Sequence, residues 1–196
     1  MDNEPQHPTG AGPAFSAVVL AGGTAARMGG VDKAGLEVAG RTLLALALEA
    51  LVDADEVVVV GPTVPTERPV TFVREDPPLG GPVDGLLTGR DALAQPPAWL
   101  GVLAVDMPRV TAYTFRRLRE AATGYDAALL VDGSGRRQLA GVVRTARLDA
   151  VRPDREGQHG MALHRLLAPL TVAEVEAEGD EGRDVDTWAD LRDLHG

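Results

Sequence analysis

Residues 15–23 read FSAVVLAGG, a short apolar run that ends abruptly in a glycine turn. The run over residues 15–20 predicts a strand that is buried on both faces, because it is almost wholly apolar and rich in β-branched side chains. The two glycines that follow predict a loop at the carboxyl end of this strand. A Leu- and Ala-rich helix is expected over residues 41–51, and EVVVV predicts a second buried strand at residues 56–60. The stretch therefore begins a strand–loop–helix–strand unit.

The same alternation continues along the rest of the chain. Asp132-Gly133-Ser134-Gly135 predicts a hairpin turn between two apolar runs. Because apolar strands that alternate with helices need cover on both sides, we expect an α/β fold with a mostly parallel sheet flanked by helices on both faces. Ligands then bind beyond the carboxyl ends of the strands. Further strands are expected at residues 70–73, 99–105, 127–131, 138–143 and 170–175, and further helices at 83–93, 111–122, 145–151, 160–167 and 187–194.

Length and composition limit the classes of protein to consider. With 196 residues, one domain is expected over residues 15–196, preceded by a disordered tail over residues 1–14. The 19 basic and 29 acidic residues give a net charge of −10, which argues against nucleic-acid or anionic membrane partners. The chain has no cysteine, so disulfides and thiolate metal sites are excluded. It also shows neither an apolar span of membrane length nor a secretory signal, and the expected location is cytoplasmic.

The loop after the first strand, residues 20–33 (LAGGTAARMGGVDK), has the composition of a phosphate-binding loop. Its four glycines allow backbone N–H groups to converge on an anion, and Arg27 and Lys33 add positive charge. Lys33 is the single lysine of the chain, since the other 18 basic residues are arginine. The spacing fits neither the P-loop pattern nor the G-x-G-x-x-G dinucleotide pattern. A flexible turn without a ligand is the alternative interpretation.

The segment LAGGTAARMGGVDKAGL resembles the signature L-A-G-G-x-x-x-R-M-G-x-D-K of nucleotidyltransferases, and especially of the MobA-like molybdenum cofactor guanylyltransferases. Later landmarks of that family recur in order, namely Glu75-Asp76, GGPVDG at residues 80–85, Asp106-Met107-Pro108 and Asp184-Val185-Asp186-Thr187. The resemblance implies a single Rossmann-like domain that transfers GMP from Mg-GTP to the terminal phosphate of molybdopterin. The products are a guanine dinucleotide cofactor and pyrophosphate. Molybdoenzymes or other proteins of cofactor biosynthesis are the further partners that it implies.

The resemblance also implies roles for individual residues. Lys33, Arg27 and Asp106 are the expected catalytic residues, and Arg27 would bind the departing pyrophosphate. Asp106 is the expected Mg²⁺ ligand, and Asp186 is a candidate second ligand. The alternative for Asp186 is a role at the N-terminal end of the last helix. The nucleotide-binding set consists of Leu20, Ala21, Gly22, Gly23, Lys33, Asp76 and Asp106.

Three departures from the family pattern keep other functions open. Residues 24–26 (TAA) lack the basic or hydroxyl side chains often found there, Gly61 replaces an asparagine, and Asp84 predicts an extra carboxylate in the base pocket. One alternative is a molybdopterin cytidylyltransferase that uses CTP. A nucleotide-binding regulatory module without turnover is the alternative from another class. A sugar-1-phosphate nucleotidylyltransferase is a weaker candidate, since such chains are usually longer.

Overall fold

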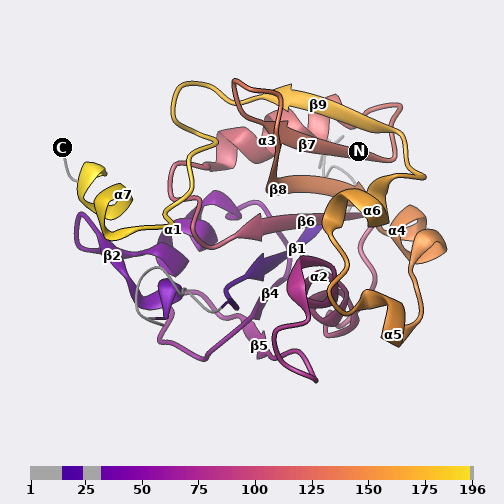
Figure 1. Ribbon diagram of the computed structural model, residues 1–196, viewed down its shortest axis with the longest axis horizontal. Coiled ribbons are helices and arrows are strands. Elements are labelled where there is room, and N and C mark those ends of the chain that lie inside the picture. Colours follow the sequence, from indigo (N-terminus) through magenta and orange to yellow (C-terminus); the bar gives the residue numbers. More distant parts are fainter. Residues whose placement is uncertain (1–14, 24–31, 195–196) are drawn as a thin grey trace, which may run out of the picture.

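A seven-stranded sheet runs through the middle of the protein, and helices cover both of its faces (Figure 1). The structure is a computed structural model that describes residues 15–23 and 32–194. The strands of the sheet are β1 (Phe15–Leu20), β4 (Val57–Val60), β5 (Thr71–Val73), β6 (Trp99–Ala104), β7 (Ala127–Val131), β8 (Arg137–Arg144) and β9 (Val172–Glu176).

The strand order is β5–β4–β1–β6–β8–β7–β9. Parallel pairs join β1 to β4 and β6, β4 to β5, and β7 to β9. β8 runs antiparallel to both of its neighbours, and it forms the predicted hairpin with β7. The prediction of a mostly parallel sheet is thereby confirmed.

The helices form one layer on each face of the sheet. On one face lie α1 (Leu43–Ala50) and α3 (Ala112–Ala121), whose buried side chains share a core. On the other face lie α2 (Gly81–Asp91), α4 (Thr145–Val151) and α6 (Leu163–Leu167) around a second core. Strand β1 serves both cores, because successive side chains of a strand point to opposite faces. Ala17 and Val19 accordingly belong to the first core and Val18 to the second.

A glycine brings α2 close to the sheet and so sets the position of its first turn. A Cβ atom at Gly89 would lie 2.5 Å from Val18 Cγ1 and 3.0 Å from Val60 Cγ2. A larger residue would therefore force α2 away from β1 and β4. The first turn of α2 begins at Gly81 and stands beside the carboxyl ends of these strands.

Short elements account for most differences from the sequence prediction. The 3-10 helix η2 (Lys33–Gly35) and the two-stranded pair of β2 (Glu37–Val38) and β3 (Arg41–Thr42) precede α1, so the predicted helix begins at Leu43 instead of at residue 41. The four-residue helix α5 (Arg155–Gln158) was not expected, and α6 starts three residues later than predicted. Thr111 and Thr187 cap α3 and α7 (Trp188–Asp193) through their side chains.

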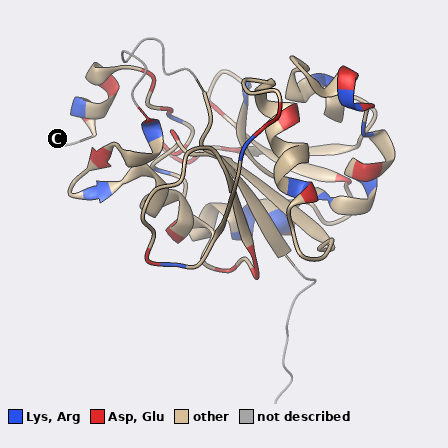
Figure 2. Cartoon of the chain, turned by 90° about the horizontal axis from the view of Figure 1, so that it is seen from below, with Lys and Arg blue, Asp and Glu red and all other residues tan. Residues whose placement is uncertain are grey.

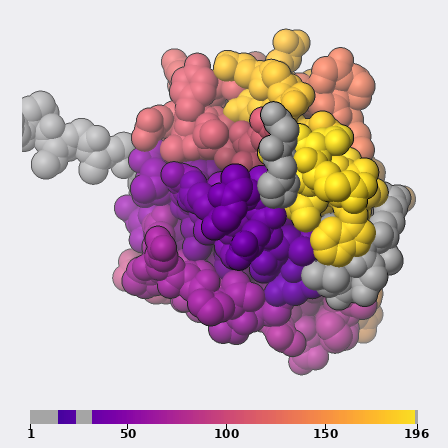
Figure 3. Space-filling view, turned by 90° about the vertical axis from the view of Figure 1, so that its left-hand side faces the viewer, coloured from indigo at the N-terminus to yellow at the C-terminus, as the bar shows by residue number. Residues whose placement is uncertain are grey.

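The C-terminal segment returns to the beginning of the domain. In Figure 3 the yellow C-terminal segment lies against the indigo segment that follows the glycine loop. Val185 and Leu191 belong to the same core as Leu43 and Leu44 of α1, which explains this contact. The segment thereby approaches the carboxyl ends of the central strands from outside the sheet.

Charged residues are distributed over the molecule without a basic face in the view of Figure 2, where acidic and basic positions are interspersed. Within residues 15–23 and 32–194, no helix has the length and apolar character needed to cross a membrane.

Candidate functional site

A cavity of about 810 Å³ opens at the carboxyl ends of β1, β4, β5 and β6. Strand β1 contributes Leu20 to its wall, followed by Ala21, Gly22 and Gly23. The wall is completed by residues after β4, β5 and β6, by the first turn of α2, and by Lys33 and Asp186. This is the edge of the sheet at which the strand pattern predicts a ligand, and the volume lies in the range of small-molecule sites.

Lys33 lies between two carboxylates at one end of the cavity. Its Nζ atom donates to Asp106 Oδ2 at 2.8 Å and to Asp186 Oδ1 at 3.0 Å. Burial alone would lower the pKa of Lys33, but the hydrogen bonds and charges of Asp106 and Asp186 outweigh it and raise the pKa. The ammonium is therefore fully charged at neutral pH, and the lysine side chain is only 16% exposed.

Local structure fixes the backbone of Lys33. The Asp32 side chain accepts a hydrogen bond from Ala34 N at 3.0 Å and caps η2, while Ala34 is completely buried. Asp106 lies two residues after the end of β6, and its carbonyl accepts from Val185 N at 2.8 Å. This backbone bond brings the neighbouring Asp186 to the strand end, although it is distant from Lys33 in the sequence.

A third carboxylate, that of Asp184, interacts electrostatically with Asp106 and Asp186, although Asp184 does not line the cavity. Burial, followed by the charges of Asp186 and Asp106, raises the pKa of Asp184. Asp106, Asp184 and Asp186 therefore lie close enough to interact electrostatically. Lys33 forms hydrogen bonds with two of them, Asp106 and Asp186. The carboxylate oxygens of Asp106 and Asp186 suit Mg²⁺, a hard cation commonly bound by one or two protein carboxylates together with waters and substrate phosphates. Among the described residues, no group of three or more His, Asp or Glu side chains has metal-binding geometry.

The opposite wall is built around Glu75, which the sequence analysis does not include among the site residues. Glu75 Oε2 accepts from Leu79 N at 3.2 Å, and both residues line the cavity. The carboxylate is packed closely against α2, since a Cβ atom at Gly85 would lie 2.9 Å from Glu75 Oε1. Burial, and next the charge of Asp84, raises the pKa of Glu75.

Asp84 lies behind the cavity wall and affects Glu75 through its charge. The sequence predicts that it contributes a carboxylate to the base pocket, but Asp84 is not among the residues that line the cavity. It is 8% exposed, its Oδ2 has no hydrogen-bond partner, and a Cβ atom at Gly80 would lie 1.9 Å from that oxygen. Its influence reaches the cavity through the charge it places near Glu75.

The model of the MobA-like NTP transferase domain matches residues 17–175 of this chain. The chain belongs to the MobA-like NTP transferase family. It is 36% identical over 133 residues to a molybdenum cofactor guanylyltransferase from Rhodopseudomonas palustris (strain HaA2), a match that covers 64% of this chain and 62% of that protein. A probable molybdenum cofactor guanylyltransferase from Opitutus terrae is 35% identical over 163 residues, with 80% of this chain and 79% of that protein covered.

A nucleotidyl transferase from Methanothermobacter thermautotroptrophicus has the same fold, with a TM-score of 0.74 and 25% identity over 94% of this chain and 97% of that chain. The match spans only about three fifths of the length of several curated relatives. The fold and family of this MobA-like chain therefore agree with the resemblance carried by its glycine loop and later landmarks.

The residues predicted for a MobA-like site fall into three groups. Leu20, Ala21, Gly22, Gly23, Lys33, Asp106 and Asp186 all line the cavity. Asp76 is exposed and does not line it; its carbonyl accepts from Arg155 Nη2 at 2.8 Å, and its role in nucleotide binding stays a prediction. Arg27 and residues 24–26 lie outside the described residues. Gly61 lines the cavity through its backbone, as its lack of a side chain implies.

Proposed function

We propose that this protein is a molybdenum cofactor guanylyltransferase, which transfers GMP from Mg-GTP to the terminal phosphate of molybdopterin. The observation that carries the proposal is the position of Lys33, held between Asp106 and Asp186 at the strand ends that the glycine loop adjoins. The names of the curated relatives support the same reaction for this chain. Molybdoenzymes or other proteins of cofactor biosynthesis are proposed as the partners that receive the product.

The chemistry requires charge neutralisation more than a strong base. The attacking phosphate of the acceptor is already a nucleophile, so the protein must orient it in line with the α-phosphate of GTP and stabilise the charge that develops. Lys33 supplies an ammonium for the phosphate oxygens, and the backbone at residues 21–23 allows their close approach. Asp106 and Asp186 would hold Mg²⁺, which supplies further charge neutralisation when it is bound. Arg27 is proposed to bind pyrophosphate as it leaves.

We propose that Glu75 recognises the guanine base of GTP. Its carboxylate lines the wall of the cavity beside Leu79 and the first turn of α2. A carboxylate accepts hydrogen bonds from guanine N1–H and N2–H together, whereas cytosine presents a single amine beside two acceptors. Glu75 therefore favours GTP over CTP as the nucleotide substrate.

Titration of the protein with GTP and CTP, each with and without Mg²⁺, tests the proposed function. At free GTP about 100-fold above Kd, binding to the native state adds about 2.7 kcal/mol to the free energy of unfolding. For a domain of this size we expect a rise of roughly 5–10 °C in Tm for Mg-GTP. Selective stabilisation by CTP would instead indicate a cytidylyltransferase, and no response to either nucleotide would favour a module without turnover. A turnover assay with molybdopterin and Mg-GTP then tests the transfer itself.

Replacing Glu75 with glutamine is expected to lower GTP affinity and to raise thermal stability. We expect GTP affinity to fall by roughly 10-fold, because one acceptor of a charge-assisted pair becomes a donor. The pKa of Glu75 is raised in the folded protein, so the wild type loses stability as pH rises from the ordinary value of 4.5 through the raised value. Glutamine does not ionise, so we expect Glu75→Gln to have a higher thermal stability at pH 7. At pH 7 the wild-type protein must keep the partly buried Glu75 carboxylate ionised, which costs stability that the glutamine variant does not lose. Calorimetric titration and thermal unfolding measure the two effects.

Asp76→Asn is the comparison that distinguishes the two neighbouring candidate acids. Asp76 is adjacent in sequence, is acidic, and is exposed outside the cavity wall. Because Asp76 is exposed and does not line the cavity, we expect its variant to lose less GTP affinity than Glu75→Gln. A loss of affinity in Asp76→Asn together with normal affinity in Glu75→Gln would assign base recognition to Asp76 instead.

A further inference from the structure

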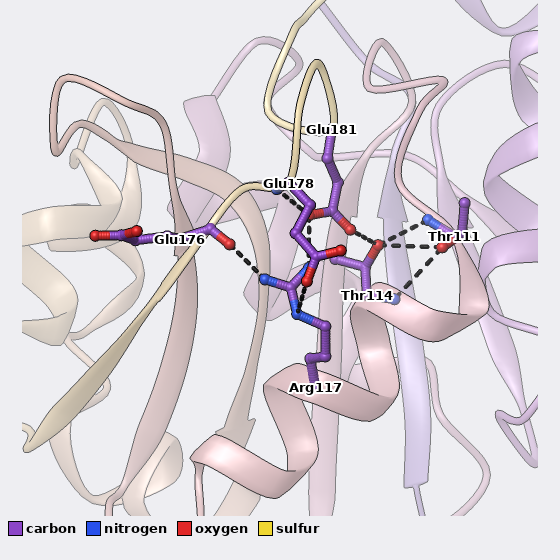
Figure 4. A network of polar contacts seen from close by, with 6 residues as sticks. All are labelled: Thr111, Thr114, Arg117, Glu176, Glu178 and Glu181. Carbon is purple, nitrogen blue, oxygen red and sulfur yellow. Dashed lines mark hydrogen bonds and ion pairs between the residues drawn. The ribbon is translucent and has the colours of Figure 1, made fainter.

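A buried polar network joins the segment before the last helix to α3. Glu181 is 7% exposed, and its carboxylate lies over α3 between Thr114 and Arg117 (Figure 4). Thr114 Oγ1 donates to Glu181 Oε1, and Arg117 Nη1 donates to Glu181 Oε2 at 2.9 Å. The same Oε2 accepts from Glu178 N at 3.0 Å. Both oxygens of a buried carboxylate are therefore satisfied.

Arg117 joins two further points of the same segment to α3. Its Nη2 atom donates to the carbonyl of Glu176, where β9 ends. Its Nε atom lies 3.3 Å from Glu178 Oε1, and the arginine side chain is 16% exposed. One guanidinium thus holds residues 176, 178 and 181 in a single arrangement, which its rigid fork of donors allows.

The segment then runs directly into the candidate site. Val185 is 1% exposed, and its N–H donates to the carbonyl of Asp106 at 2.8 Å. Asp186 accepts from Lys33 Nζ at 3.0 Å, five residues after Glu181. Neither Arg117 nor Glu181 lines the cavity. The network thus lies outside the cavity and contacts the chain shortly before it enters the site.

We propose that the Arg117–Glu181 pair is a positioning device that holds Asp186 against Lys33 and Asp106. The role of this pair in catalysis rests on the proposed function. A buried ion pair stabilises a protein little compared with well-packed apolar side chains, so net stability alone does not account for it. Its specific effect is to fix residues 177–187 before substrate binds, so that the ordering of this segment need not accompany binding.

Because Lys33 is the single lysine of the chain, its contact with Asp186 can be observed directly. Biosynthetic labelling with lysine that carries ¹³C at Cε gives one side-chain NMR signal, which needs no assignment. Asp186→Asn marks the shift that follows loss of the charged contact. We expect Glu181→Gln to move the Lys33 signal toward the Asp186→Asn position, and Arg117→Met to move it further. Glu181→Gln keeps the shape of the side chain and serves if Arg117→Met fails to fold.

The kinetic arm uses GMP transfer with molybdopterin and Mg-GTP. For Glu181→Gln we expect kcat to fall by about 10-fold and the Mg²⁺ concentration for half-maximal rate to rise, as is usual for groups that orient ligating side chains. Asp149→Asn is the control, since it breaks the Arg90–Asp149 pair at 2.7 Å, in which the arginine side chain is equally exposed at 16%. This control should change neither the Lys33 signal nor the rate.

An unchanged Lys33 signal in both Glu181→Gln and Arg117→Met would overturn the positioning role. A shifted signal with wild-type kcat and Mg²⁺ dependence would overturn its importance for transfer. If wild-type protein transfers no GMP, the proposed function fails, while the NMR comparison still decides whether the pair holds Asp186 in place.

Discussion

Replacing Lys33 with alanine is expected to slow GMP transfer by about 10²-fold or more. The Lys33 Nζ atom lies in the cavity, 2.8 Å from an Asp106 oxygen and 3.0 Å from an Asp186 oxygen. Removing it takes an ammonium from the developing charge on the phosphates and leaves Asp106, Asp184 and Asp186 to repel one another. Steady-state assays of transfer at saturating Mg-GTP measure the change in kcat.

Two comparisons separate the catalytic effect of Lys33 from its effect on folding. The raised pKa of Lys33 means that its contribution to stability is present below the ordinary value of 10.5 and is lost as pH rises through the raised value. Lys33→Ala should therefore unfold at a lower temperature at pH 7 but still cooperatively. Lys33→Arg keeps the charge on a larger, planar group and should give an intermediate rate. Near-normal transfer in Lys33→Ala would remove Lys33 from the mechanism.

The sequence predicted the elements whose residue types favour a single local structure, such as an apolar β-branched run or a glycine-rich turn. The apolar run of residues 15–20 predicts β1 within its observed bounds, and residues 132–135 predict the turn between β7 and β8. The two-residue strands β2 and β3 and the four-residue helix α5 leave too few side chains for a periodic pattern. Their positions depend on tertiary packing, which local pattern does not describe.

The candidate site divides in the same way. The glycine loop and Asp106 lie at strand ends, so a strand prediction combined with a parallel sheet suffices to bring them together. The choice of Glu75 over Asp76 depends on the path of residues 74–80, where Leu79 has a φ of 66° that a leucine seldom adopts. The Arg117–Glu181 pair joins residues 64 positions apart. No spacing rule connects residues at that separation, and the contact is visible only in the folded chain.

Replacing Asp106 with asparagine is expected to abolish the dependence of GTP binding on Mg²⁺. Asp106 lies two residues after the end of β6, has a side chain that is 23% exposed, and lines the cavity together with Asp186. Asparagine keeps the size of the side chain but removes the charge, and a hard divalent cation binds a neutral amide oxygen much more weakly than a carboxylate. In thermal unfolding, the extra stabilisation that Mg²⁺ gives to the GTP complex of the wild type should disappear, and transfer should fall by about 10²-fold or more.

Asp186→Asn gives the graded comparison for this prediction. Asp186 is more exposed than Asp106, at 41% against 23%, and reaches the site from the C-terminal segment instead of from a strand of the sheet. If both acids hold the cation, Asp186→Asn should weaken the Mg²⁺ dependence and Asp106→Asn should remove it, because the better-fixed ligand contributes more. Unchanged Mg²⁺ dependence in Asp106→Asn would exclude a metal-binding role for Asp106. Its carboxylate would then serve to orient Lys33, whose ammonium would be the main positive charge facing the triphosphate.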